Sequence, residues 1–334
     1  MERADGAGIE SMIEERCGID ALSGYQPKDF IETAEGLVFA VVAEDLDDER
    51  VLATLRYLRI PGGFQKLSTR EGDELLTDHY PHYIHYSKAR DVTLHGVHRD
   101  LVCVHHQPRQ RLRTMRLQIP HDEIEQKLHR LMTLFEANGL DPDGIGVTGS
   151  LLIGAQKRSS DIDLLFYRQT VFRKARKIIK SLLAERQLQP LDSALWREAY
   201  GRRGCSLTFD EYLWHEQRKY NKAAIEGTKF DITYLNPNPW QDLLCYRKQG
   251  THNLKVYVVD DSHSFEYPAR YLLDHPAIKE AVSYTATYVG QAMRGERVAI
   301  RGQLEVSSVG HLRIVIGTNR EASDEYIKVL SRQH

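Results

Sequence analysis

Short apolar runs separated by turn residues dominate the first third of the chain. Residues from Leu37 to Ala43 are all apolar, and a mainly apolar segment from Val51 to Leu58 follows the turn at 46–49. A continuous apolar run behind a turn signal is typical of a buried strand, and with the second segment as its partner strand the two predict a hairpin. The elements predicted after it are a strand over 64–67, a helix over 71–79 and strands over 83–87, 92–97 and 101–105. With at most a short helix near 9–16 before them, the segment 1–118 is predicted to be a mixed α/β module.

Apolar residues at helical spacing mark the middle of the chain. One stripe runs from Ile124 to Phe135, just before Asn138-Gly139, a common helix stop. A second stripe runs from Val171 to Leu183. Its opposite face carries the cations Arg173, Lys174, Arg176, Lys177 and Lys180. Other predictions are a linker from 107, strands over 145–147, 162–167 and 229–235, and helices over 194–200 and 209–224. The segment 119–240 is therefore expected to form a mixed sheet with helices on one face.

Beyond Pro237-Asn238-Pro239, the apolar segments are short and punctuated by glycine. Strands are predicted over 254–259, 265–271, 282–289, 297–306 and 312–316, with one helical piece over 276–280. Several short strands of this kind are typical of a small antiparallel β-barrel or a curled sheet. The predicted fold class is therefore α/β plus β, with the C-terminal segment 241–334 as a β-rich, barrel-like domain.

Composition excludes a protein that is basic throughout. The 334 residues carry 45 Lys and Arg against 47 Asp and Glu, so any nucleic-acid surface must be a local patch. The four cysteines (Cys17, Cys103, Cys205 and Cys245) are widely spaced, as expected of reduced thiols in a cytoplasmic protein. No apolar run approaches the length of a membrane span, and the N-terminus lacks the apolar core of a signal peptide, so no membrane association is expected.

Two acidic residues share one face of a predicted strand. Asp161 and Asp163 flank Ile162, and side chains alternate along a strand, so both carboxylates project to the same side. They would lie about 7 Å apart and repel each other unless a cation sits between them. Hard oxygen ligands of this kind suit Mg²⁺, with Mn²⁺ as the other candidate. Gly149-Ser150, where a phosphate can approach the backbone closely, precedes Asp161 with a gap of ten residues between them.

These residues together form a known pattern. Gly149-Ser150, the gap of ten residues and Asp161-Ile162-Asp163 resemble the active-site motif of the DNA polymerase beta nucleotidyltransferase superfamily. That superfamily has a third carboxylate on a later strand, and Asp231, between Phe230 and Ile232, matches it. The overall layout is similar to that of archaeal predicted nucleotidyltransferases. The resemblance implies a nucleotidyltransferase domain over 119–240.

The resemblance also implies an activity and roles for residues. The activity is transfer of a nucleoside monophosphate from an NTP to a hydroxyl acceptor, with release of pyrophosphate. Asp161, Asp163 and Asp231 would be the catalytic residues and metal ligands, and Gly149 and Ser150 would hold the phosphates. Arg218 and Lys219, close before the third carboxylate, are predicted to bind the nucleotide because of their position. The alternative for these two is an exposed helix with ordinary charge pairs.

Several alternatives stay open. The acceptor predicted here is RNA, such as an RNA 3′ end, because of the cationic helix over 171–183 and the arginines of the linker. Those cations would equally suit a solvated helix face, and the acceptor would then be a protein or a small molecule. Other classes are a non-catalytic nucleotide- or RNA-binding protein on the same fold, and a phosphoesterase that uses the same metals.

Histidine is concentrated between residues 79 and 106. The seven histidines there are His79, His82, His85, His95, His98, His105 and His106. They suit a structural role, contact with nucleic acid beside Tyr80, Tyr83 and Tyr86, or metal binding. No acid or cysteine recurs near them at the spacing of metal ligands, so the structural role is favoured and no stoichiometric metal is expected.

Overall fold

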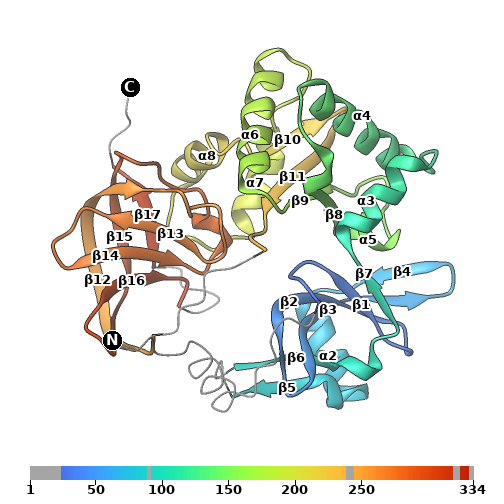
Figure 1. Cartoon of the computed structure of the whole chain (residues 1–334), viewed down its shortest axis with the longest axis horizontal. Coiled ribbons are helices and arrows are strands. Elements are labelled where there is room, and N and C mark those ends of the chain that lie inside the picture. Colours follow the sequence, from blue (N-terminus) through green and yellow to red (C-terminus); the bar gives the residue numbers. More distant parts are fainter. Residues whose placement is uncertain (1–23, 89–91, 238–243, 319–323, 331–334) are drawn as a thin grey trace, which may run out of the picture. The chain divides into compact units, whose positions relative to one another are not determined.

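The computed structural model describes residues 24–88, 92–237, 244–318 and 324–330, which form a mixed α/β structure with three sheets. The helix predicted near 9–16 lies outside these residues. The chain divides into two compact units, described here separately. The first contains residues up to Glu125 together with Ile145–Ile162, and the second contains Gln126–Gly144 together with the chain from Asp163 onward. Each of the three segments predicted above contains one of the three sheets (Figure 1).

The first unit is built on a seven-stranded sheet with the order β5-β6-β3-β2-β1-β7, and β4 pairs with β3. Its strands are β1 (Phe30–Glu32), β2 (Leu37–Asp47), β3 (Arg50–Ile60), β4 (Gly63–Lys66), β5 (Ile84–Ser87), β6 (Val92–His98) and β7 (Val104–His106). The predicted hairpin is confirmed as β2 and β3, joined at Asp48 and Glu49. Both turn residues have positive φ, 49° and 59°, as a tight hairpin turn requires.

The helices of the first unit include one that the sequence did not predict. The predicted helix over 71–79 is confirmed as α2 (Thr69–His79), which begins with a capping box between Ser68 and Glu71. The predicted linker is wrong: its residues form helix α3 (Pro108–Leu117). Proline suits the first turn of a helix, and the buried Leu112 and Met115 give α3 an apolar side that its many arginines obscured.

A four-stranded sheet with the order β10-β11-β9-β8 carries the candidate site. Its strands are β8 (Ile145–Thr148), β9 (Ile162–Phe166), β10 (Lys222–Ile225) and β11 (Thr228–Tyr234). The associated helices are α4 (Glu123–Ala137), the short α5 (Ser150–Ile153), α6 (Gln169–Ala184), α7 (Ser193–Gly201) and α8 (Phe209–Gln217). The apolar stripes predicted as α4 and α6 are confirmed (Figure 1).

The helix predicted over 209–224 is wrong in its second half. Helix α8 ends at Gln217, and residues Lys222–Ile225 form β10. Tyr220 has a φ of 49°, in the left-handed region that ends a right-handed helix. The apolar residues after it are all buried beside β11, so sheet pairing decides their conformation.

The third sheet has six strands with the order β12-β13-β14-β16-β15-β17. They are β12 (Tyr246–Asp260), β13 (Ala269–Leu273), β14 (Ile278–Ser283), β15 (Arg297–Ser307), β16 (Leu312–Ile316) and β17 (Tyr326–Val329). β12 also pairs with β15, so the series of pairings from β12 through β13, β14 and β16 to β15 leads back to β12. The helical piece predicted over 276–280 is wrong, because Ile278 begins a strand between β13 and β16. The sheet is also not entirely antiparallel, since β14 and β16 run parallel.

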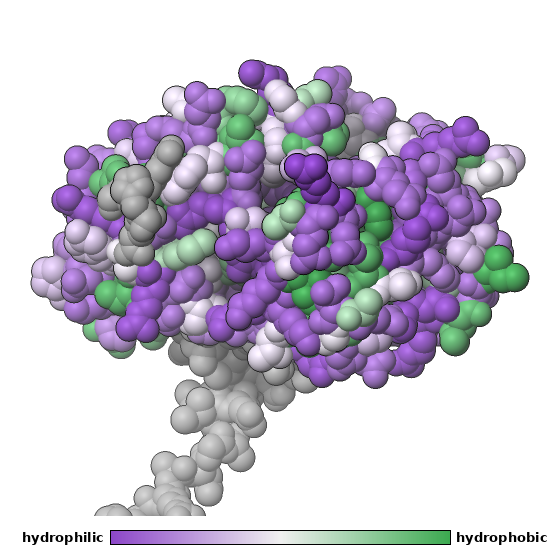
Figure 2. Space-filling view, turned by 90° about the horizontal axis from the view of Figure 1, so that it is seen from above, coloured by the Kyte–Doolittle hydropathy of each residue, from purple (hydrophilic) through white to green (hydrophobic). Residues whose placement is uncertain are grey.

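The hydrophobic core of the second unit joins α7 and α8 to the third sheet. Trp196 of α7 and Tyr212 of α8 are buried in one cluster with residues of β12 to β17, among them Tyr271 and Ile314. On the face shown in Figure 2, hydrophilic residues predominate and the hydrophobic ones are scattered in small groups. Among the described residues, no helix is both long enough and apolar enough to cross a membrane.

Candidate active site

Strand β11 directs its two sets of side chains to opposite faces of the four-stranded sheet. Phe230 contacts Phe135 of α4 edge-on, with ring centroids 6.5 Å apart, and Tyr234 stacks on Phe172 of α6 at 5.8 Å. The even-numbered residues of β11 therefore face the helices. Because side chains alternate along a strand, Asp231 faces the other way.

Strand β9 has the same orientation. Phe166 contacts Phe172 of α6 edge-on, at 5.9 Å between ring centroids, so Phe166 also faces the helices. Asp163 lies three positions before Phe166 and is half-buried on the opposite face. Asp163 and Asp231 therefore project from the face of the sheet that α4 and α6 do not cover.

A hydrogen bond at the ends of β9 and β11 fixes how the two strands align. The N–H of Leu235 donates to the carbonyl oxygen of Phe166 at 2.9 Å. This bond lies at the C-terminal end of both strands, since β9 ends at Phe166 and β11 at Tyr234. The strands are neighbours in the sheet, so they run parallel and Phe166 lies beside Tyr234. Three residues further back on each strand, a regular register brings Asp163 beside Asp231. Neighbouring strands are about 4.8 Å apart, which is close enough for both carboxylates to bind one cation.

The two oxygen atoms of Asp231 have different surroundings. Oδ2 lies 3.3 Å from the Nζ of Lys229, which projects from the same face of β11. Oδ1 is buried and accepts no hydrogen bond from any described residue. A buried carboxylate oxygen without a donor is costly, and a bound cation would remove that cost. Oxygen donors on neighbouring strands fit a hard divalent ion such as Mg²⁺.

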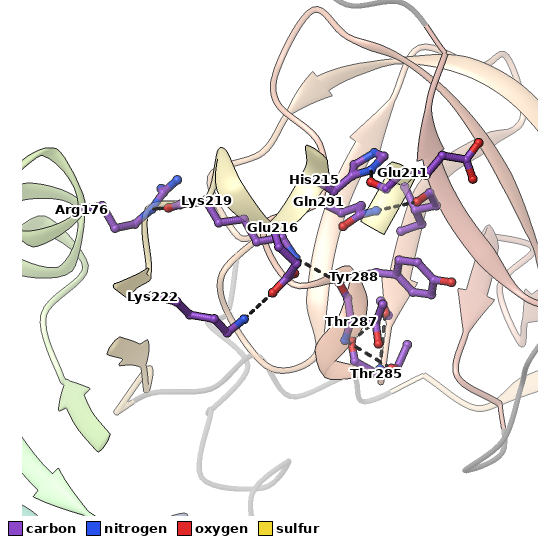
Figure 3. A network of polar contacts seen from close by, with 12 residues as sticks. Arg176, Glu211, His215, Glu216, Lys219, Lys222, Thr285, Thr287, Tyr288 and Gln291 are labelled. Atoms are coloured by element: carbon purple, nitrogen blue, oxygen red, sulfur yellow. Dashed lines mark hydrogen bonds and ion pairs between the residues drawn. The ribbon is translucent and has the colours of Figure 1, made fainter. Parts of the chain in front are cut away.

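A second lysine lies beside Asp231 on strand β10. Lys222 is directly opposite Asp231 in the β10–β11 pairing, so the two side chains share a face. The Nζ of Lys222 donates to the carboxylate of Glu216, which also accepts from Lys219 (Figure 3). Burial opposes the charge of Lys222, but Glu216 and Asp231 together raise the pKa of Lys222 above its ordinary value. A positive charge is therefore held next to the candidate catalytic carboxylate.

Glu216 is held as a carboxylate inside the protein. Burial favours its neutral form, yet Lys219 and Lys222 lower the pKa of Glu216 to about 2. Lys219 is only 2% exposed, and its Nζ also donates to the carbonyl oxygen of Thr287 at 3.0 Å (Figure 3). Burial lowers the pKa of Lys219 to about 8 in spite of Glu216.

The two residues predicted to bind the nucleotide make their contacts within the protein. Lys219 belongs to the buried cluster around Glu216. Arg218 donates to Glu296 at 2.6 Å, and its guanidinium group lies 4.5 Å from the centre of the Trp214 ring. Lys222 and Lys229 were not among the residues assigned to the nucleotide, although both lie beside Asp231. The alternation of Lys229 with Asp231 in the sequence was a usable signal.

The remaining predicted site residues lie next to two strands. Gly149 and Ser150 directly follow β8, and Gly149 has φ 67° and ψ −144°, a conformation that glycine adopts readily and other residues rarely do. Asp161 is half-buried just before β9. These three residues fall in the first unit, whereas Asp163 and Asp231 fall in the second.

Comparison with known proteins identifies a relative of nearly the same length. The chain is 31% identical over 335 residues to the uncharacterized protein MJ1086 of Methanocaldococcus jannaschii. The aligned region covers 90% of this chain and 98% of the relative. The chain belongs to the family of this archaeal protein. No protein-family model matches it, and no solved structure does either. The similarity extends over most of the chain and is not confined to the Asp-Ile-Asp segment.

Proposed function

We propose that the protein is a metal-dependent nucleotidyltransferase, with the four-stranded sheet and helices α4 and α6 as its catalytic domain. The observation that carries the proposal is the placement of Asp163 and Asp231 on one face of neighbouring strands, with Oδ1 of Asp231 buried and without a donor. The sequence motif adds Asp161, Gly149 and Ser150. A purely structural role for Asp231 would require a hydrogen-bond donor for its buried Oδ1, and the described residues supply none.

The proposed reaction moves a nucleoside monophosphate from an NTP to a hydroxyl group. The acceptor oxygen forms a bond to the α-phosphorus as the bond to the leaving pyrophosphate breaks. Bound Mg²⁺, or Mn²⁺ in its place, would neutralise phosphate charge and make the acceptor hydroxyl more acidic. Asp161 and Asp163 would hold the ion on the nucleotide side, and Asp231 would take up the proton of the acceptor.

The lysines beside Asp231 would contribute positive charge. Lys222 and Lys229 lie on the same face as Asp231, and Lys222 is kept protonated by Glu216. Cations fixed near the reacting phosphate stabilise the charge that develops in the transition state. Both side chains already contact carboxylates, so no rearrangement of the backbone is required to keep them there.

The proposed acceptor is RNA, and the third sheet offers the surface for it. Lys255 and Tyr257 are exposed on the same side of β12, and Arg297 of β15 is directly opposite Tyr257. An exposed aromatic ring between cations suits base stacking beside phosphate contacts. The cations of α6 lie on the face of the four-stranded sheet away from Asp163 and Asp231, so they are less suited to guide the acceptor.

Pyrophosphate release tests the proposal directly. Purified protein is incubated with each NTP and Mg²⁺, with and without total RNA, and pyrophosphate and labelled product are measured. Mg²⁺-dependent pyrophosphate formation with transfer of label supports the proposal. Cleavage of a phosphoester without any need for an NTP would indicate the phosphoesterase instead, and NTP binding without turnover would indicate a binding protein.

A further inference from the structure

Three potential metal ligands meet in the first unit, apart from the candidate active site. Asp47 and Asp48 come from the end of β2 and its turn, and His85 comes from β5. One ligand atom of each residue lies within 4.8 Å of the other two. His85 is far in the sequence from the adjacent Asp47 and Asp48, so the spacing of the histidines gave no sign of this group.

The sheet explains how these residues come together. β6 pairs with both β3 and β5, so it is the one strand between β5 and the β2–β3 hairpin that carries Asp47 and Asp48. Gly96 on β6 leaves the space that the His85 side chain needs. A Cβ atom at Gly96 would lie 2.8 Å from the Cβ of His85, closer than such atoms approach in proteins. A glycine at this position therefore allows His85 to lie close over β6.

One nitrogen of the His85 imidazole makes no hydrogen bond to a described residue. Nε2 is buried and makes no hydrogen bond within the described part of the chain, although it lies 3.4 Å from Oδ1 of Asp47. His85 as a whole is 9% exposed. By contrast, His95 and His105 contact Asp73 and Asp29 through Nε2 at 2.9 and 2.7 Å. A histidine paired with an acid in this unit can thus form a regular hydrogen bond, and His85 does not.

Neighbouring groups orient the cluster. Ser87 donates to Oδ2 of Asp47, which leaves Oδ1 on the side of His85. Arg50 of the hairpin donates through Nη1 to the carbonyl oxygens of His82 and Gly96, both at 3.1 Å. Because Nε2 makes no hydrogen bond among the described residues and lies close to the carboxylate of Asp47, a metal ion held by the three side chains would give this nitrogen a partner.

We propose that Asp47, Asp48 and His85 bind a divalent transition-metal ion, with Zn²⁺ as its representative. One imidazole nitrogen and two carboxylate oxygens favour such an ion over Mg²⁺, which prefers oxygen ligands alone. Three protein ligands leave a fourth position of a tetrahedral zinc site open. Asp48 is exposed, so that position is accessible to solvent. The inference is independent of the proposed nucleotidyltransferase function.

Zinc titration of full-length protein tests this site. The protein is first freed of metal and carries Asp163→Asn and Asp231→Asn, so that the candidate active site does not compete for the ion. Isothermal titration is expected to show one zinc ion per chain that a large excess of Mg²⁺ does not displace. Adding His85→Ala should abolish this binding, and adding Asp48→Asn should weaken it by at least about tenfold, which is about 1.4 kcal/mol.

Controls separate loss of a ligand from loss of the fold. Asp48 is at an exposed turn position with positive φ, which asparagine tolerates well, so Asp48→Asn should fold normally. His98→Ala is the matched control, because His98 and Asp100 form an exposed pair with a separation of 3.5 Å. Absence of stoichiometric zinc, or equal zinc affinity in His85→Ala, Asp48→Asn and the parent protein, would overturn the proposal.

Discussion

At the scale of single residues, Asp163 is the most direct test of the proposed chemistry. Asp163→Asn keeps the size of the side chain but removes a charge that the ion requires. We expect nucleotide transfer to fall by more than a hundredfold, about 2.7 kcal/mol or more, because both metal affinity and transition-state stabilisation are lost.

The measurement is the rate of label transfer at saturating Mg²⁺, with folding checked by circular dichroism. Asp274→Asn makes the same change of charge at an exposed position directly after β13 and should leave transfer unchanged. A rate for Asp163→Asn within tenfold of the wild type would mean that the reaction does not depend on this carboxylate.

Glu216 is predicted to contribute to stability, because its removal would leave a buried lysine without a carboxylate partner. Glu216→Gln would deprive the fully buried Lys219 of its carboxylate partner and remove the ion pair with Lys222. Breaking a buried ion pair on one side costs about 3–5 kcal/mol, which urea unfolding measures as a lower midpoint. Glu211→Gln is the control, because its partner Lys328 is partly exposed and glutamine keeps the capping box of α8. Equal midpoints for the two variants would show that the buried cluster contributes little.

His215 predicts a specific dependence of stability on pH. Burial lowers the pKa of His215 to about 4, and Nε2 accepts a hydrogen bond from Val329. Between about pH 6.5 and pH 4, the unfolded chain takes up a proton at this residue and the folded protein does not. Stability should therefore fall by up to about 3 kcal/mol as pH is lowered through this window.

Urea unfolding at several pH values between 4 and 7 measures this effect. His215→Gln cannot take up the proton, so the wild type should lose more stability than the variant across the window. Parallel curves for the two proteins would show that His215 titrates alike in the folded and unfolded states.

The sequence predicted individual acids better than individual cations. Strand alternation predicted that Asp161 and Asp163 project to one side, and the structure has Asp163 in β9 and Asp161 just before it. The strand predicted around Asp231 is confirmed as β11. Lys219 and Lys222 were both assigned to one helix. The end of α8 and the start of β10 depend on tertiary pairing with β11, which local propensity does not contain.

At the scale of elements, most strands and helices followed from periodicity, and the errors have a common cause. Helix α3 was hidden by its arginines, and the start of β14 was predicted to be a helical piece. In both cases a few buried apolar residues decide the conformation through their neighbours. Strand β17 is only four residues long and follows a polar segment, so its pattern was too short to read.

The exposed residues of strands β12 and β15 provide a test of RNA as the acceptor. Changing Lys255, Tyr257 and Arg297 together to Ala should weaken RNA binding, since stacking contributes about 1–3 kcal/mol per base. It should also make the dependence of affinity on salt less steep, because fewer counterions are released. Binding of labelled RNA at several salt concentrations measures both effects.

The matched control changes Arg173, Lys174 and Lys177 of α6 together to Ala, which removes a similar charge from a different surface. NTP binding should be retained in both variants. A wild type that binds no RNA at low salt would exclude RNA as the acceptor, and a loss of binding confined to the α6 variant would place the RNA on that helix.

At the scale of the whole molecule, the second unit joins segments that the sequence analysis had separated. Buried residues of α7 and α8 form one core with the third sheet, and Lys219 reaches Thr287 in the connection between β14 and β15. The composition at Pro237-Asn238-Pro239 favours a boundary in the chain. It does not reveal that residues before this boundary pack against residues after it, because that depends on which apolar faces meet.

The pairing of β12 with β15 also affects how readily a strand from another molecule can add to this sheet. In a sheet that ends in free edges, unpaired main-chain groups can recruit a strand from another molecule and begin aggregation. Here β12, β13, β14, β16 and β15 each have a strand on both sides. A sheet arranged in this way can stay folded at high concentration with ordinary, even partly apolar, side chains on its outer surface, because it presents few main-chain groups to which another strand could add.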